Sequence, residues 1–435
     1  MKFGPNTPIS SPYEHLNNFN IPKINILAAT AKQFHSPIIR QSTFFNALIA
    51  KYQGTKMNHN DLLSKFVRTD EINLYWTKIN TRGFIPDART GATMNYHHQS
   101  LYIFAGEKAD QNNDIKRLDC ATLIWDKVTP KNLNNSEIPV VMSGHATVIY
   151  KHYLIVYGGF SSFDPLLQIR SISSLIYCFD LETLIWKSYK PAGSIPEPRR
   201  GHSACSVGNS FVMYSGMDCR GTLIPSLGVL NMEEMTWVSF KIKGDIPPIR
   251  KECTLTPVYD QGVLDHFGFD VFNSPKHYDN AANKNTSGIY MFGGLNSKGR
   301  PLNDLYILKG QPNKSKPLLN EFVWVKITTT GRIPTPRYGH TGNYVNGFLI
   351  VLGGRNDDVV GGIVGEISLL RISNWRWETV NAFGDCPHAR IGASAVSVGS
   401  RILLFGGMHL TEFASATLFE LETDSKKVIE FISYK

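Results

Sequence analysis

The sequence of 435 residues is poor in the features of secreted, membrane-spanning and metal-binding proteins. Its six cysteines are scattered, with no CxxC pair and no cluster with histidine, which argues against a zinc site and favours free thiols in a reducing compartment. No apolar run approaches the roughly 18 residues of a membrane-spanning helix. The first 13 residues lack the apolar centre of a secretory signal. We therefore expect a soluble cytoplasmic protein without membrane insertion. The single acid in residues 1–60, Glu14, leaves a mitochondrial transit peptide as the alternative.

Charge is also sparse. Charged residues make up 19% of the chain, below the roughly 25% of average globular proteins. The net charge of +9 is spread along the chain rather than gathered in a stripe, which argues against nucleic-acid binding. The excess favours acidic partners in general. With 42% hydrophobic residues, disorder over most of the length is excluded.

A repeat occurs six times in the chain. Each unit has a proline in a phrase such as GFIPDARTGA, then an apolar run that ends in a glycine pair, a second apolar run and a tryptophan. Proline and second glycine are 20 residues apart in every unit except the fourth, which carries 27 extra residues, an insertion at 261–287. The tryptophan precedes the next proline by 10 residues, or by 14 before the second unit. The markers are Pro86, Pro139, Pro196, Pro247, Pro334 and Pro387, and Trp76, Trp125, Trp186, Trp237, Trp324 and Trp377.

Within each unit the apolar runs are four or five residues long and end at glycine, asparagine or serine, which predicts strands rather than helices. About four short strands per unit, repeated six times, predict an all-β six-bladed β-propeller over residues 71–435 with four antiparallel strands per blade. Glycine pairs permit close backbone approach at the end of the second strand. They are Gly158 and Gly159, Gly293 and Gly294, Gly353 and Gly354, and Gly406 and Gly407. We expect each tryptophan to pack between blades with a partner for its N–H group.

This order of R-x-G-H, Gly-Gly and spaced tryptophan resembles the kelch repeat, over residues 72–435. Ala105 and Ser215 depart from it by replacing one glycine of a pair. The resemblance implies a kelch-type propeller of the galactose oxidase-like kind. It also implies protein binding by the loops that follow the glycine pairs and those that enter the inner strands. Kelch propellers serve in ubiquitin-ligase, cytoskeletal and signalling complexes, and the resemblance singles out none of these.

Two segments compete for the outer strand of the sixth blade. One is 73–78 with Trp76, which we favour because the last repeat has no tryptophan of its own; the other is 428–432. Residues 1–70 form an N-terminal extension, in which 44–52 and 61–66 have the pattern of short amphipathic helices. This extension could dock a partner, pack against the propeller or stay irregular.

An arginine stands three residues after the marker proline in every unit but the second, where Met142 replaces it. Because register fixes these arginines, we predict a structural inter-blade hydrogen bond; a clamp for carboxylates or phosphates is the alternative. We interpret His145, His202 and His340, which share another register position, as core histidines rather than metal ligands. The irregular spacing of Asp265, His266, Asp270 and His277 also argues against a metal. The arginines are Arg89, Arg199, Arg250, Arg337 and Arg390.

The loops after the glycine pairs carry residue types that no repeat-wide requirement explains, so we expect binding there. In the second blade Phe160, Phe163 and Arg170 resemble the aromatic and arginine anchors of protein interfaces. On the same face we expect Lys108, Asp218, Arg220, Arg300, Arg355 and His409.

Catalytic motifs such as GxSxG, HExxH and the phosphate loop do not occur. We predict a non-enzymatic protein–protein interaction module, a scaffold or adaptor without metal or cofactor, that binds a protein partner of acidic character. The alternatives are a structural subunit of a larger assembly anchored by residues 1–70, and a metal-dependent kelch-fold enzyme.

Overall fold

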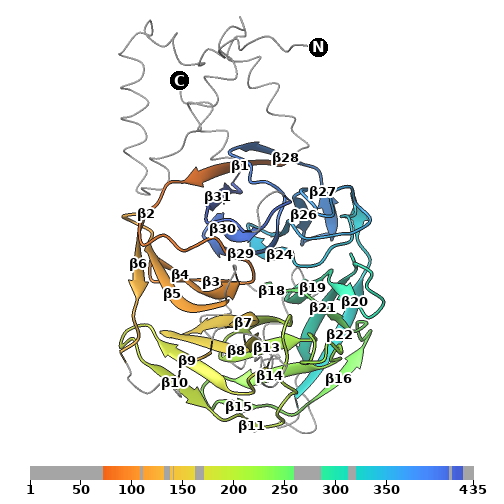
Figure 1. Ribbon diagram of the computed structural model, residues 1–435. Coiled ribbons are helices and arrows are strands. Elements are labelled where there is room, and N and C mark those ends of the chain that lie inside the picture. Colours follow the sequence, from red (N-terminus) through yellow and green to blue (C-terminus); the bar gives the residue numbers. More distant parts are fainter. Residues whose placement is uncertain are drawn as a thin grey trace, which may run out of the picture.

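Six β-sheets stand around a common axis as the blades of a propeller in the computed structural model (Figure 1). The structure describes residues 72–107, 111–131, 138–140, 142–161, 171–258, 286–311, 320–410 and 414–424. None of these residues lies in a helix, and accordingly this part of the chain contains no helix that could cross a membrane. The predicted extension at 1–70 and the insertion up to residue 285 lie outside the described residues.

Each blade is an antiparallel meander of four strands that run outward from the axis. Blade 1 has β3 (Thr93–His97), β4 (Ser100–Glu107), β5 (Gln111–Asp119) and β6 (Ile124–Val128). Blade 2 has β7 (Met142–Tyr150), β8 (Tyr153–Ser161), β9 (Ile176–Asp180) and β10 (Trp186–Tyr189). Blade 3 has β12 (Ser203–Val207), β13 (Ser210–Tyr214), β14 (Leu227–Asn231) and β15 (Thr236–Trp237).

The last three blades repeat this order. Blade 4 has β18 (Thr254–Val258), β19 (Gly288–Phe292), β21 (Leu305–Gln311) and β22 (Asn320–Ile327). Blade 5 has β24 (Thr341–Val345), β25 (Phe348–Leu352), β26 (Ser368–Arg371) and β27 (Arg376–Glu378). Blade 6 has β29 (Ile391–Val398), β30 (Arg401–Met408), β31 (Leu418–Glu422) and, from the start of the described chain, β1 (Ile72–Ile79).

A fifth strand, parallel to its neighbour, edges every sheet but that of blade 2, so four strands per blade was an incomplete prediction. It ends at a glycine three residues before the marker proline, with φ between 78° and 86°. A Cβ atom on this glycine would lie 2.1 to 2.4 Å from the backbone oxygen of the blade's tryptophan, so no other residue fits. The fifth strands are β2 (Arg82–Gly83), β11 (Ala192–Gly193), β16 (Phe240–Gly244), β23 (Thr330–Gly331) and β28 (Val380–Gly384).

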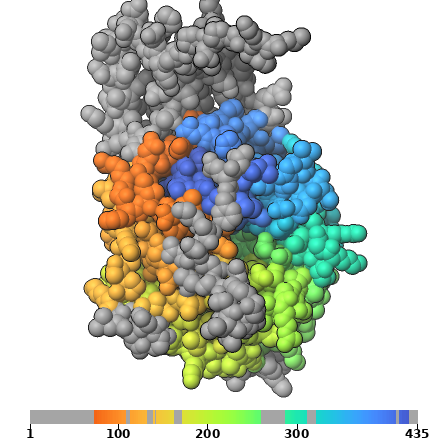
Figure 2. Space-filling model, viewed as in Figure 1, coloured from red at the N-terminus to blue at the C-terminus, as the bar shows by residue number. Residues whose placement is uncertain are grey.

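The ring closes through Trp76's strand, as predicted. Strand β1 pairs antiparallel with β31, where Trp76 faces Leu421, and parallel with β28, where Trp76 faces Gly384. The competing segment at 428–432 lies outside the described residues. As a consequence, the first blade of the described chain (orange) lies beside the last (blue) in Figure 2.

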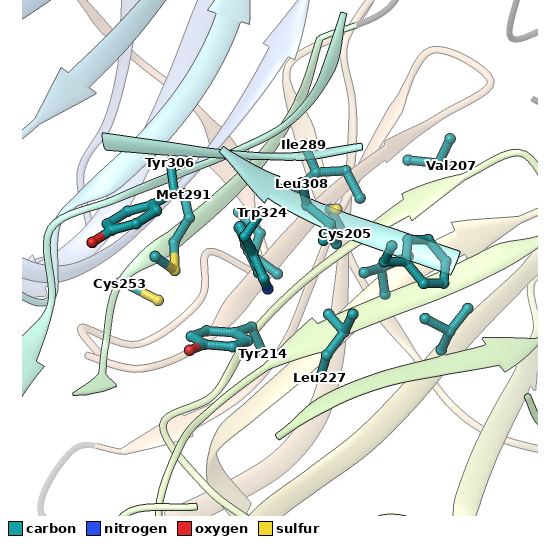
Figure 3. Packing of buried hydrophobic residues seen from close by; sticks show 14 residues of the cluster. Cys205, Val207, Tyr214, Leu227, Cys253, Ile289, Met291, Tyr306, Leu308 and Trp324 are labelled. Carbon is teal, nitrogen blue, oxygen red and sulfur yellow. The ribbon is translucent and has the colours of Figure 1, made fainter. Parts of the chain in front are cut away.

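The core is divided into six apolar clusters in the described part of the chain, one at each seam between neighbouring blades. At the seam of blades 3 and 4, the ring of Tyr214 packs edge-on against Trp324 with 5.1 Å between ring centroids (Figure 3). The same contact, from the residue before the glycine pair to the tryptophan of the next blade, recurs at four other seams. It joins Phe104 to Trp186, Tyr157 to Trp237, Phe292 to Trp377 and Phe405 to Trp125.

The indole N–H groups behave less regularly than predicted. Trp125 donates to the Thr81 hydroxyl at 3.0 Å. The N–H groups of Trp237, Trp324 and Trp377 have no acceptor among the described residues, so the expected partner is missing there. These rings serve mainly as apolar plates.

Candidate functional site

The marker arginines are buried structural residues whose guanidinium groups act within their own blade. Arg250 is fully buried and donates to the Pro248 oxygen at 3.0 Å, the Gly293 oxygen at 2.9 Å and the carboxylate of Asp304 at 3.0 Å. Arg89 binds Asp114, Arg199 binds Ser226 and Arg337 binds Glu366 in the same way. With their donors engaged in this manner, these groups are poorly placed to clamp a ligand.

The predicted inter-blade hydrogen bond is present at these residues, but the guanidinium groups do not make it. It is the backbone oxygen of the same residue that bonds to the preceding blade, accepting from the N–H of that blade's second glycine. Gly294 donates to the Arg337 oxygen at 2.8 Å, and Gly407 donates to the Arg89 oxygen at 2.9 Å. Each marker residue thus anchors its own blade with its side chain and the previous one with its backbone.

Blade 2 replaces this ion pair by an apolar pair. Met142 takes the position of the arginine, and Leu175 takes the position that Asp114 and Asp304 occupy in blades 1 and 4. In each blade this position directly precedes the third-strand residue that pairs with the last residue before the glycine pair. Met142 is 1% exposed and Leu175 packs against its cluster. In blade 2 the arginine and its partner are thus both replaced by apolar residues, whereas blade 3 keeps Arg199 and has Ser226 at the partner position.

Burial sets the titration of these core groups. It lowers the pKa of Arg199 and Arg337 to about 10. At Arg250 burial also acts to lower the pKa, but the hydrogen bond and charge of Asp304 outweigh it, and the pKa is raised. Burial lowers the pKa of His145, His202 and His340 to about 3, so these imidazoles stay neutral at physiological pH.

Two of these histidines bond to the neighbouring blade. His145 Nε2 lies 3.0 Å from the Thr93 hydroxyl and His340 Nε2 lies 3.3 Å from the Thr254 hydroxyl. Across the described ranges, no group of three His, Cys, Asp or Glu side chains is arranged to hold a metal ion. The geometry supports core histidines.

Next to the axis the inner strands are joined by backbone hydrogen bonds from blade to blade, such as Gly201 N–H to the Gly144 oxygen at 2.8 Å. Five of the six positions in this ring are glycine, and the sixth is Glu252, with φ of 54°. Glu252 donates its N–H to Gly201 and accepts from Gly339, both at 2.9 Å. Its carboxylate pairs with Lys251 at 3.3 Å, so a charged pair lies at one end of the axis.

We define the loop face as the two residues after each marker arginine together with the loop after each glycine pair. Backbone bridges hold these two segments side by side within a blade. Arg200 pairs with Met217, Tyr338 pairs with Arg355, and in blade 4 the pairing forms the small sheet of β17 (Arg250–Lys251) and β20 (Leu295–Asn296). Residues far apart in sequence therefore make one surface.

The loop face of blades 3 and 4 carries a cluster of cations. Asp218 Oδ1 accepts from the backbone N–H groups of Arg220 and Thr222, and Asn296 Oδ1 accepts from those of Lys298 and Arg300. These side-chain turns shape both loops and leave their basic residues exposed. We name the resulting cluster the basic arc: Arg200, Arg220, Lys251, Lys298 and Arg300.

The structure places the predicted binding residues in different surroundings. The Arg200 guanidinium lies 4.6 Å from the centre of the Phe160 ring, and Arg355 pairs with Asp357 at 2.7 Å. The ring of His409 lies 4.6 Å from that of His388. Asp218, Arg220 and Arg300 belong to the loops just described, whereas Lys108, Phe163 and Arg170 lie outside the described residues.

Sequence reasoning missed Arg200, Lys251 and Glu252. Each follows a marker arginine by one or two positions. The first position varies and is Thr90, Ser143, Arg200, Lys251, Tyr338 or Ile391 in the six blades, whereas the second is glycine in every blade but the fourth, which has Glu252. Variation inside a strict repeat was the signal that could have found them.

The model of the KLHDC2/KLHL20/DRC7 Kelch-repeats domain matches residues 44–268 and 272–433. The chain belongs to this kelch-repeat family. Kelch propellers in general mediate protein–protein interaction.

Among curated proteins, the chain is similar to acyl-CoA-binding domain-containing protein 4 of Arabidopsis thaliana, 25% identical over 90% of this chain and 54% of the relative. Kelch domain-containing protein 2 of Bos taurus is 25% identical over 64% of each chain. Kelch domain-containing protein 3 of Homo sapiens is 23% identical over 68% of this chain and 69% of its own length. The chain spans about half the length of the first of these relatives.

Proposed function

We propose that this kelch propeller is a non-enzymatic adaptor or scaffold that binds an acidic segment of a protein partner on the basic arc. The observation that carries the proposal is the imbalance of charge there. The five cations of the arc share their segments with two exposed or half-buried carboxylates, those of Asp218 and Glu252. Asp218 is engaged in its loop turn, and Glu252 in its pair with Lys251.

The remaining cations are available to a partner. Arg200, Arg220, Lys298 and Arg300 have no carboxylate partner in the described part of the chain, and the last three are exposed. Such charges attract an acidic segment over roughly a Debye length, about 8 Å at physiological salt. The stack of Arg200 on Phe160 adds a rigid aromatic and arginine pair of the type that carries binding energy at interfaces.

The non-enzymatic part of the proposal is supported by the state of the polar core. The marker arginines donate hydrogen bonds within their own blades, and the histidines are buried and neutral. Groups that could have carried catalysis are thus used to hold the ring. All six cysteines are unpaired, which supports a reducing compartment, and we propose a cytoplasmic location for the protein.

Affinity capture of the full chain followed by mass spectrometry tests the proposal. The test variant reverses two charges of the arc, Arg220→Glu and Arg300→Glu. The matched control reverses two exposed lysines on the outer strands of blades 1 and 2, Lys127→Glu and Lys187→Glu. We expect a partner that the wild-type chain and the control retain, that the arc variant loses, and whose binding weakens as salt increases.

Two results contradict this expectation. If the arc variant captures the partner as well as the control does, the basic arc is not the binding surface. If a chain that starts at residue 72 loses the partner while the arc variant keeps it, the N-terminal extension is the anchor. That result would support the alternative that the protein is a structural subunit of a larger assembly.

A further inference from the structure

A cavity of about 240 Å³ lies at the seam between blades 5 and 6. Leu352 and Val364 of blade 5 line it, together with Trp76 and Leu404 of blade 6 and with Pro387. Its rim includes the exposed residues Cys386 and His388, so the cavity opens to the surface. It is separate from the basic arc, which belongs to blades 3 and 4.

The cavity lies where an aromatic ring is missing. In five blades the residue before the glycine pair is Phe or Tyr, and its ring packs on the tryptophan of the next blade with 5.0 to 6.1 Å between centroids. In blade 5 this residue is Leu352, and the tryptophan of the next blade is Trp76. Leucine does not fill the space of a ring, and the tryptophan face borders a cavity instead.

A hydrogen-bond donor is missing at the same place. At four seams a side chain of the preceding blade donates to the oxygen of the marker proline. Tyr157 and Tyr214 use their hydroxyls, toward Pro196 at 3.4 Å and Pro247 at 2.9 Å. In blades 1 and 4, where the ring is Phe, the donors are Asn113 toward Pro139 and Asn303 toward Pro334, both at 3.0 Å.

Blade 5 has neither donor. Leu352 stands in the position of the tyrosines, and Gly365, directly before Glu366, stands in the position of the asparagines. No group among the described residues donates to the Pro387 oxygen. Three of the charged groups in the wall have partners, since Glu366 binds Arg337, Glu378 binds Arg371 and Arg390 donates to the Gly406 oxygen at 2.9 Å; the fourth, Arg332, is exposed.

We propose that this seam cavity binds a phenol ring, which packs on Trp76 and donates its hydroxyl to the Pro387 oxygen. The seams of blades 2 and 3 show the same arrangement with the chain's own Tyr157 and Tyr214 as occupants. The size is adequate, because an apolar cavity of about 150 Å³ already binds benzene. The phenol can belong to a free small molecule or to a tyrosine side chain of a partner.

Fluorine NMR of 4-fluorophenol with the full chain tests the site. We expect a saturable shift with a Kd on the order of 1 mM, as is reasonable for a ligand of this size. Leu352→Tyr supplies the missing ring and should weaken binding at least about tenfold. The control Leu410→Tyr makes the same change at an exposed leucine outside the cavity and should leave the Kd unchanged. The absence of a saturable shift, or equal binding by Leu352→Tyr, would overturn the proposal.

The hydroxyl contact has its own test. The methyl ether 4-fluoroanisole has no donor and should bind about three- to tenfold more weakly than 4-fluorophenol. Gly365→Asn restores the donor of blades 1 and 4 and should remove this difference between the two ligands, a result that does not depend on the folding of Leu352→Tyr. Equal binding of both ligands to the wild-type chain would refute the assigned hydrogen bond.

N-acetyltyrosinamide distinguishes the two sources of the ring. If it displaces 4-fluorophenol, the opening admits a tyrosine attached to a polypeptide backbone. If it does not, the site is one for free phenols. If N-acetylphenylalaninamide, which has no hydroxyl, displaces 4-fluorophenol as well as N-acetyltyrosinamide does, the proposed hydrogen bond of the hydroxyl is wrong.

Discussion

Blade 2 offers a natural template for a test of the arginine positions. There the Met142 and Leu175 pair occupies the place of an arginine and its carboxylate partner. We transfer this pair to blade 4 by the changes Arg250→Met and Asp304→Leu, first singly and then together. A buried ion pair replaced by apolar residues of similar volume is often tolerated, whereas removal of one partner leaves an uncompensated charge.

The structure sets the expected magnitudes. Arg250→Met removes the donors to the Pro248 oxygen, the Gly293 oxygen and the Asp304 carboxylate, all of which are buried or partly buried. We expect the free energy of unfolding to fall by about 3–5 kcal/mol. Asp304→Leu in the same chain removes the stranded charge, so the double variant should recover about 2 kcal/mol of this loss.

Urea unfolding followed by tryptophan fluorescence measures these differences. The control is Arg220→Met, the same chemical change at an exposed arginine, for which we expect a change of about 0.5 kcal/mol or less. Two outcomes would refute the reasoning. One is a double variant no more stable than Arg250→Met, and the other is an Arg250→Met variant as stable as the control.

Three further predictions concern the axis, the fifth strands and the closure of the ring. Because burial lowers the pKa of His202 to about 3, the unfolded chain takes up its proton first as the pH falls below about 6.5, and the stability from the neutral imidazole is lost over that range. His202→Ala should therefore reduce the loss of unfolding free energy between pH 7 and pH 5 by about 2 kcal/mol, and an unchanged loss in urea titrations at both pH values would contradict this. Gly331→Ala should lower the free energy of unfolding by about 3 kcal/mol or more, since its Cβ would lie 2.1 Å from a backbone oxygen. The control Gly347→Ala, with φ of 82° but no atom within 4 Å of the Cβ, should lower it by only about 1 kcal/mol. Equal losses of the two variants in urea unfolding would rule out the clash. Trp76→Ala should lower the free energy of unfolding by about 3–5 kcal/mol, and a smaller loss than about 1 kcal/mol would show that β1 does not close the ring.

Much of the fold was predictable because a repeat imposes the same local requirement six times. The strands around Phe104 and Phe292 share a length, a glycine boundary and a distance to their proline, and such regularities do not depend on knowing any contact. Even the closing strand was predicted, because Trp76 has the spacing of the internal tryptophans. The family match confirms the kelch propeller on independent grounds.

The details that the prediction lacked depend on partners distant in sequence. The fifth strand forms because Gly193 pairs with the backbone of Trp237. The place of a glycine within the repeat does not reveal which strand it will approach. The sequence also did not show that the arginines bond to the neighbouring blade through their backbone oxygens, because register shows that a residue is required but not which of its groups makes the contact. On the loop face, the contact of the Arg200 guanidinium with the Phe160 ring joins two neighbouring blades and cannot be inferred from the sequence.

The sequence by itself determined the number of blades, the order of their strands and the closure of the ring, because periodicity and residue type control local backbone conformation and the burial of apolar faces. Only the tertiary structure decided which loops lie together as the basic arc, where each arginine donates its hydrogen bonds and that Leu352 leaves a cavity beside Trp76. These features arise where blades meet, and contact across a seam is set by packing in three dimensions rather than by distance along the chain.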